Sequence, residues 1–143
     1  MEERFMEEAL KEAKKAFNVG ETPIGAVVVY NNKIIAKAHN KREKNNDPMG
    51  HAEILAIKKA CNKIGDWRLN ECLLFVNVEP CIMCMGLIIE TRIKTIYCSI
   101  PNKKYISSLE QIIKINKVDI KYGVFEKESK ELLQRFFKNK RIK

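Results

Sequence analysis

The chain has 143 residues, 45% of them hydrophobic and 31% charged, a composition that predicts one globular domain over residues 1–143. No run of about 18 apolar residues occurs, so the sequence excludes a membrane-spanning helix. The formal net charge of +9 indicates a polyanionic partner, nucleic acid foremost, unless it reflects only a general bias toward Lys, Ile and Asn.

The predicted elements alternate between helices and strands along most of the chain. Apolar residues at helical spacing predict a first helix over Phe5–Phe17, and Pro23–Tyr30 and Lys33–His39 read as a hairpin across Asn31-Asn32. The later predicted elements are a helix at His51–Ile64, strands at Cys72–Val78 and Ile93–Ile100, a helix at Cys81–Glu90, a strand at Val118–Phe125 and a helix at Glu126–Lys140.

This order, with one more helix of unassigned bounds before the last strand, predicts an α/β fold. One hairpin followed by strands that alternate with helices implies a mixed five-stranded sheet between two layers of helices, a three-layer α/β/α sandwich. The nearly continuous apolar run Cys72–Val78 is typical of a strand buried on both faces.

Two short motifs carry residues suited to metal chemistry. His51 and Glu53 open one predicted helix, and Cys81 and Cys84 lie in the first turn of the next, on one face of it. One imidazole and two thiolates suit zinc and leave a fourth position open for water, which zinc makes nucleophilic near neutral pH. Glu53 can exchange a proton with that water only if His51 stands at the very start of its helix.

Three other interpretations use the same residues. A closed structural zinc site needs a fourth ligand, and a redox role for Cys81 and Cys84 leaves His51 and Glu53 without a task. A non-catalytic zinc-stabilised RNA-binding module likewise has no use for Glu53. The candidates for a fourth ligand are His39, Cys61, Cys72 and Cys98, although the three cysteines are most simply buried hydrophobes and His39 a structural residue.

With no secretory signal over the first 15 residues, we expect the five cysteines to be thiols or ligands rather than disulfides.

The pattern H-x-E followed by P-C-x-x-C resembles the signature of zinc-dependent cytidine and adenosine deaminases. Nearly the whole chain is similar to the bacterial tRNA-specific adenosine deaminase family within that superfamily. The stretches that carry the resemblance are GETPIGAVVV (20–29), Asn40, DPMGHAEILAI (47–57), WRL (67–69), VEPCIMC (78–84), Arg92-Ile93 and ELLQRFFKNKR (131–141).

The resemblance implies a cytidine-deaminase-like fold and a homodimer with one Zn²⁺ per subunit. It also implies hydrolytic deamination of adenosine to inosine at the wobble position, 34, of a tRNA anticodon, with the base everted from the anticodon stem-loop. The corresponding protein is cytoplasmic, and neither a membrane nor DNA is an expected partner.

Residue by residue, the resemblance makes His51, Cys81 and Cys84 the zinc ligands and Glu53 the catalytic proton shuttle for a zinc-activated water. The residues it assigns to substrate binding are Asn40, Pro23, Ile24, Ala52, Val78 and Glu79. Those it assigns to RNA binding are Lys103, Lys104, Ser108, Phe137, Lys138, Lys140 and Arg141.

The sequence departs from the family in two places. Met49-Gly50 replaces the Thr-Ala common before the histidine, and PNKKYISSLEQIIKINK (101–117) replaces a glycine-rich segment near the RNA. Both changes leave the metal motif and Glu53 intact and bear on RNA recognition. A zinc-dependent deaminase of a free base or nucleotide, guanine or cytosine, is therefore the alternative, although the basic tail with Phe136-Phe137 favours RNA.

Overall fold

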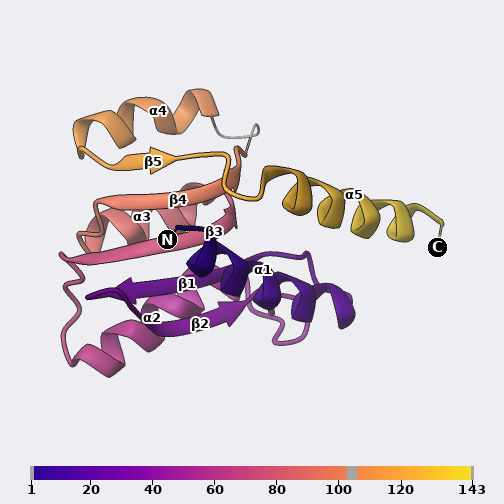
Figure 1. Cartoon of the computed structure of the whole chain (residues 1–143), viewed down its shortest axis with the longest axis horizontal. Coiled ribbons are helices and arrows are strands. Elements are labelled where there is room, and N and C mark those ends of the chain that lie inside the picture. The colour runs from indigo at the N-terminus through magenta and orange to yellow at the C-terminus, as the bar shows by residue number, and fades with distance from the viewer. Residues whose placement is uncertain (1, 103–105, 143) are drawn as a thin grey trace.

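A five-stranded sheet in the order β2-β1-β3-β4-β5 forms the centre of the computed structural model, which describes residues 2–102 and 106–142 (Figure 1). The strands are β1 (Gly25–Tyr30), β2 (Lys33–His39), β3 (Cys72–Val78), β4 (Thr95–Ile100) and β5 (Asp119–Lys121). The helices are α1 (Glu2–Asn18), α2 (Ala52–Ile64), α3 (Ile82–Glu90), α4 (Ile106–Ile115) and α5 (Glu126–Ile142).

The sheet is mixed, as the element order predicts. Strand β1 is antiparallel to both β2 and β3, whereas β4 is parallel to β3 and to β5. The turn between β1 and β2 places Asn31 and Asn32 at φ 54° and 63°, the left-handed pair that a two-residue hairpin requires and that asparagine tolerates. Strand β3 lies at the centre and is buried along nearly its whole length, which confirms the interpretation of its apolar run.

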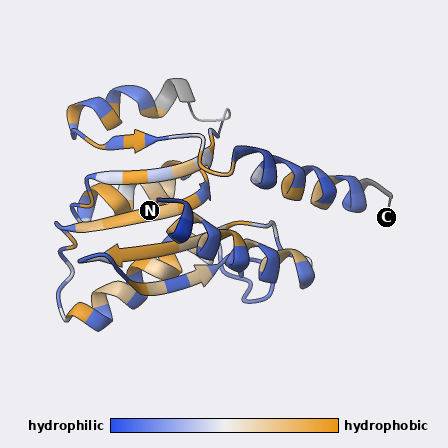
Figure 2. Cartoon of the chain, in the orientation of Figure 1, coloured by the Kyte–Doolittle hydropathy of each residue, from blue (hydrophilic) through white to orange (hydrophobic). Residues whose placement is uncertain are grey.

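Helices cover both faces of the sheet, so the predicted three-layer arrangement is confirmed. On one face α1 packs Phe5, Met6 and Ala9 against Phe75 of β3. The larger cluster, on the opposite face, joins α2, α3 and α4 to the strands, and Figure 2 shows its apolar residues along the central strands and α3. Within the part of the chain that the structure describes, no helix is both long and apolar enough to cross a bilayer.

Three predicted strands are longer in the sequence analysis than in the structure, among them Pro23–Tyr30, which pairs only from Gly25 onward. The predicted strand Val118–Phe125 is wrong beyond its centre, because only Asp119–Lys121 pairs with β4. Gly123, at φ 99°, and Phe125, at φ 55°, then turn the chain into α5. The strand predicted at Ile93–Ile100 begins only at Thr95 in the structure, since Arg92 is left-handed at φ 70° and the Ile93 N–H still bonds to the Ile88 carbonyl of α3.

Gly25, the first residue of β1, allows the closest approach of a helix to the sheet. A Cβ at this position would lie 2.1 Å from the Ala9 carbonyl oxygen and 2.5 Å from the Ala13 nitrogen of α1. We expect Gly25→Ala to lower the free energy of unfolding by about 3 kcal/mol, because backbone atoms must move apart. Gly86→Ala in α3 is the control; a Cβ there meets nothing within 4 Å, and an added methyl favours the helix. Guanidinium unfolding curves measure both, and equal stabilities would contradict the close packing.

Candidate active site

The two motifs of the sequence meet at one edge of the sheet. Val78 of β3 lies opposite Ile100 of β4 in the parallel register, so the carboxyl ends of both strands open at this edge. Gly25 is opposite His39 in the β1–β2 hairpin, which brings the segment before β1 and the segment after β2 to the same edge. Such an edge, where parallel strands end and helices begin, is the usual location of a site in an open α/β sheet.

His51 and Cys81 occupy equivalent positions on two different helices. Each is the N-cap residue of its helix, with extended backbone angles of φ −82°, ψ 145° for His51 and φ −71°, ψ 176° for Cys81. The carbonyls of these residues accept the first helical hydrogen bonds, from Leu55 and Met85. The prediction that His51 stands at the very start of its helix is therefore confirmed. As N-caps, His51 and Cys81 each come one residue before the helices α2 and α3, which begin one residue later than predicted.

The three predicted metal ligands form a compact cluster. The ligand atoms of His51, Cys81 and Cys84 all lie within 4.8 Å of one another. His51 Nδ1 is 3.6 Å from Cys81 Sγ and 3.5 Å from Cys84 Sγ. Bond lengths to tetrahedral zinc place a nitrogen and a sulfur ligand about 3.6 Å apart. The donor set and its spacing thus fit a zinc ion, with room for a fourth, non-protein ligand.

Hydrogen bonds inside the cluster shift its protonation. The Cys84 thiol donates to Cys81, which together with His51 lowers the pKa of Cys81 to about 4. The same bond raises the pKa of Cys84, and the bond to Cys81 raises the pKa of His51. The three residues therefore already stabilise one thiolate. Because metal ligands must be deprotonated, binding of a divalent cation here releases protons.

Glu53 lies in the first turn of α2 beside this cluster, and its side chain is 3% exposed. Burial raises the pKa of its carboxyl to about 7, and the negative charge of Cys81 adds to that effect. Its Oε1 atom has no hydrogen-bond partner among the residues that the structure describes. An unpaired buried carboxylate oxygen is costly in a fold and is typical of a group that serves a reaction.

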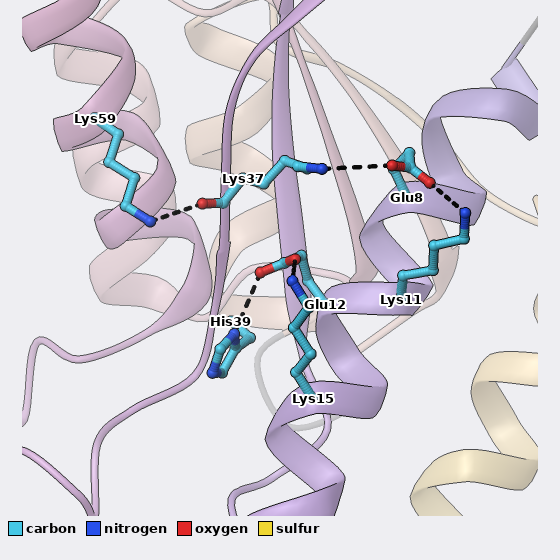
Figure 3. Close-up of polar contacts among 7 residues, drawn as sticks. All are labelled: Glu8, Lys11, Glu12, Lys15, Lys37, His39 and Lys59. Carbon is cyan, nitrogen blue, oxygen red and sulfur yellow. Dashed lines mark hydrogen bonds and ion pairs between the residues drawn. The ribbon is translucent and has the colours of Figure 1, made fainter.

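The residues considered for a fourth, structural ligand lie elsewhere. His39 Nδ1 is 3.2 Å from Glu12 Oε1 on α1, and Lys15 contacts the other oxygen of that carboxylate at 2.6 Å (Figure 3). Within residues 2–102 and 106–142, the only cluster of potential ligands is that of His51, Cys81 and Cys84. All five cysteines are free, and Cys61, Cys72 and Cys98 do not join it. This arrangement disfavours a closed structural site.

The predicted substrate residues gather around the same edge. Asn40 is buried and bonds to the segment before β1: its backbone N–H donates to the Ile24 carbonyl and its Nδ2 to the Thr22 carbonyl, at 3.1 and 3.4 Å. Ala52 and Pro23 are buried, whereas Ile24 and Val78 are partly exposed. The geometry thus places Asn40 beside Pro23 and Ile24.

The Glu79 carboxylate is turned toward the loops that follow β4 and β5. It accepts hydrogen bonds from the Asn102 backbone N–H and from the Tyr122 hydroxyl, both at 3.0 Å. Burial beside this carboxylate raises the pKa of Tyr122. The Glu79 side chain is thus committed to holding loops, and its backbone N–H donates to the Ile100 carbonyl, which leaves the backbone carbonyl for a ligand.

The predicted RNA-binding residues are only partly described. Lys103 and Lys104 lie outside the described residues, as do the side chains of Ser108 and Arg141. Phe137 is 49% exposed, and Lys138 and Lys140 are exposed on the same helix, α5. The described part of the set therefore lies on one accessible helix.

Sequence reasoning missed a buried polar pair, Asn77 and Ser129. Asn77 is fully buried in β3, and its side chain bonds to three residues in two other segments of the chain, Pro23 and Gly25 in one and Ser129 in the other. The sequence does mark this pair in one way: Asn77 is a single polar residue inside the apolar run CLLFVNV. A polar side chain at such a position needs partners, which makes it a marker of a tertiary connection.

Comparison with known proteins adds an independent finding. The family model of MafB19-like deaminases matches residues 1–141. A tRNA-specific adenosine deaminase of Bacillus subtilis (strain 168) is 40% identical over 148 residues, 99% of this chain and 92% of that protein. A structure from a study of A-to-I editing by tRNA:A34 deaminases at the wobble position has a TM-score of 0.84 at 37% identity, covering 91% of this chain and 99% of that one. A guanine deaminase from Bacillus subtilis has a TM-score of 0.68 at 36% identity, covering 74% and 68%.

Proposed function

The chain belongs to the MafB19-like deaminases and, among them, to the tRNA-specific adenosine deaminases, and we propose that it converts adenosine 34 of a tRNA anticodon to inosine by hydrolysis. The observation that carries this proposal is the buried Glu53, with its unpaired oxygen, beside the cluster of His51, Cys81 and Cys84. Residues 1–143 form one catalytic domain in this proposal, since every strand among the described residues belongs to one sheet.

The reaction consumes water and releases ammonia, and Glu53 moves the protons. His51, Cys81 and Cys84 would hold one zinc ion per subunit, which would act as a Lewis acid that makes water nucleophilic near neutral pH. Glu53 accepts a proton from the attacking water and delivers it to a ring nitrogen while C6 of adenine is attacked. Glu53 then carries the second proton to the departing amine. The free Oε1 of Glu53 supports this assignment because the atom is available for proton transfer.

A stacked adenine cannot reach this site, so the base must be everted from the anticodon loop. Pro23, Ile24 and Val78, with the backbone near Ala52 and Glu79, form the walls of the purine pocket in this proposal. Asn40 hydrogen-bonds the everted nucleotide. Its backbone hydrogen bond to Ile24 supports the assignment, because it holds Asn40 next to the segment proposed to border the purine.

The exposed face of α5 binds the phosphates of the stem-loop in this proposal. We expect Lys138→Gln with Lys140→Gln to weaken stem-loop binding and to make its dependence on salt shallower, because fewer counterions are released. The matched control is Lys58→Gln with Lys63→Gln on α2, which removes the same charge from other exposed positions. Titrations at several salt concentrations measure both; equal slopes for the two pairs would contradict a role for α5.

The proposed activity is tested by inosine formation in an anticodon stem-loop that contains a wobble adenosine. Free adenosine, adenine, guanine and cytosine serve as parallel substrates. Turnover of the stem-loop alone supports the proposal. Turnover of guanine or cytosine instead establishes the alternative, that the departures at residues 49–50 and 101–117 have redirected the same chemistry to a free base.

We further infer that the enzyme is a cytoplasmic homodimer. Helix α3 carries no charged residue before Glu90, yet Ile82 and Met83 are 50% and 36% exposed. Exposed apolar side chains on such a helix are typical of an interface. Light scattering should give the mass of two chains, and a single-chain mass at all concentrations would oppose this.

A tRNA substrate and five free thiols favour the cytoplasm, which cell fractionation can check.

A further inference from the structure

Helix α5 is attached to the body of the protein by few buried side chains. Of its described side chains, only Ser129, Leu132 and Phe136 are buried. Figure 1 shows the helix running outward past the end of the sheet. Phe136 packs edge-on against Phe17 of α1, with ring centroids 6.3 Å apart. Ser129 is the polar member of this stripe, and its exposure is 0%.

Ser129 is bonded to the end of β3 in two ways. Its hydroxyl donates to the Asn77 carbonyl oxygen at 2.8 Å, and it accepts from Asn77 Nδ2 at 3.2 Å. Both residues are fully buried, so these bonds have no competition from water. The first turn of α5 is thereby held to the strand that leads, through Val78 and Glu79, to the ligand Cys81.

The same Asn77 side chain holds the segment before β1. The backbone pairing of β1 with β3 ends at Ala26 and Val76, and beyond it the Gly25 N–H donates to Asn77 Oδ1 at 2.8 Å. Asn77 Nδ2 also donates to the Pro23 carbonyl at 2.9 Å. The amide side chain thus takes the place of one further backbone pair, and it fixes the course of Pro23 and Ile24.

We propose that Asn77 and Ser129 are positioning residues that connect α5 to the Pro23–Ile24 segment, so that a contact between RNA and α5 steadies the pocket for the everted base. This inference rests on the proposed function, in which α5 meets RNA and Pro23–Ile24 borders the purine. Neither side chain needs to touch the substrate. The connection acts on how tightly an RNA is held rather than on the hydrolytic step.

The test is Ser129→Ala, which removes the tie to α5 and leaves the Asn77 bonds to Gly25 and Pro23. We expect KM for the anticodon stem-loop to rise about 5-fold or more, while kcat and metal content stay within about 2-fold of wild type. Ser99→Ala is the matched control. Ser99 is a serine of β4 that is 1% exposed and whose hydroxyl has no partner within the described residues, so its loss should leave KM unchanged.

A second measurement is hydrogen exchange with and without the stem-loop. In wild-type protein the stem-loop should slow hydrogen exchange both in α5 and at the Gly25 amide, whereas in Ser129→Ala only α5 should respond. An unchanged KM in Ser129→Ala would overturn the connection. So would protection of α5 in the wild-type protein without protection of the Gly25 amide. If wild type fails to deaminate the stem-loop at all, the proposed function fails instead, and wild-type turnover distinguishes the two cases.

Discussion

Glu53→Gln should reduce inosine formation by about 10²–10⁴-fold while the protein keeps its fold and its metal. Glutamine has nearly the shape of glutamate and fits the same buried position, but its amide cannot accept and return a proton. The loss should appear in kcat rather than in KM, because the carboxylate exchanges protons during the reaction and is not needed to hold the RNA.

Steady-state kinetics on the stem-loop, with metal analysis of the same preparation, measure this effect. Glu90→Gln is the control, since Glu90 is an exposed glutamate at the end of α3. This variant should deaminate the stem-loop at the wild-type rate. Retained deamination by Glu53→Gln would remove Glu53 from the mechanism. Loss of metal along with activity would mean that the carboxylate supports the metal site instead.

Cys84→Ser should lose both metal and activity. The serine hydroxyl is close to the thiol in size but does not ionise as a ligand at neutral pH, so the site retains only His51 and Cys81 as donors. Zinc affinity should fall by more than about 100-fold, because even loss of an outer partner of a metal ligand costs 10- to 100-fold. Turnover should fall below detection at zinc concentrations that saturate wild type.

Competition with a zinc chelator gives the affinities. Cys61→Ala is the control, because Cys61 is a free, partly exposed cysteine of α2 outside the cluster, and its loss should leave metal content unchanged. Full metal content and normal turnover in Cys84→Ser would show that Cys84 is not a ligand. Full metal content with no turnover would mean that the third donor is needed only to set the reactivity of the bound water.

Local chemistry explains why most of the fold could be predicted. The period of the apolar residues marks α1 and α2, a nearly continuous apolar run marks β3, and the two asparagines at 31 and 32 suit the hairpin turn. The last strand is shorter than predicted because the chain turns away from β4, which itself continues to Ile100. Tyr122, Val124 and Phe125 have the aromatic and apolar side chains typical of a strand, but the chain leaves β4 at Lys121 and turns at Gly123.

The sequence by itself determined the chemistry of the candidate site. Its residues belong to two short motifs whose internal spacing follows from helix geometry, one with His51 and Glu53 and the other with Cys81 and Cys84. Only the tertiary structure decided how those motifs meet, with Nδ1 of His51 about equally far from both sulfurs, at 3.6 and 3.5 Å, and with Oε1 of Glu53 left unpaired. It alone decided the partners of Asn77 and Ser129, which are 52 residues apart in the chain. Burial makes a polar side chain find a partner, but the packing of helices on the sheet determines which one is within reach.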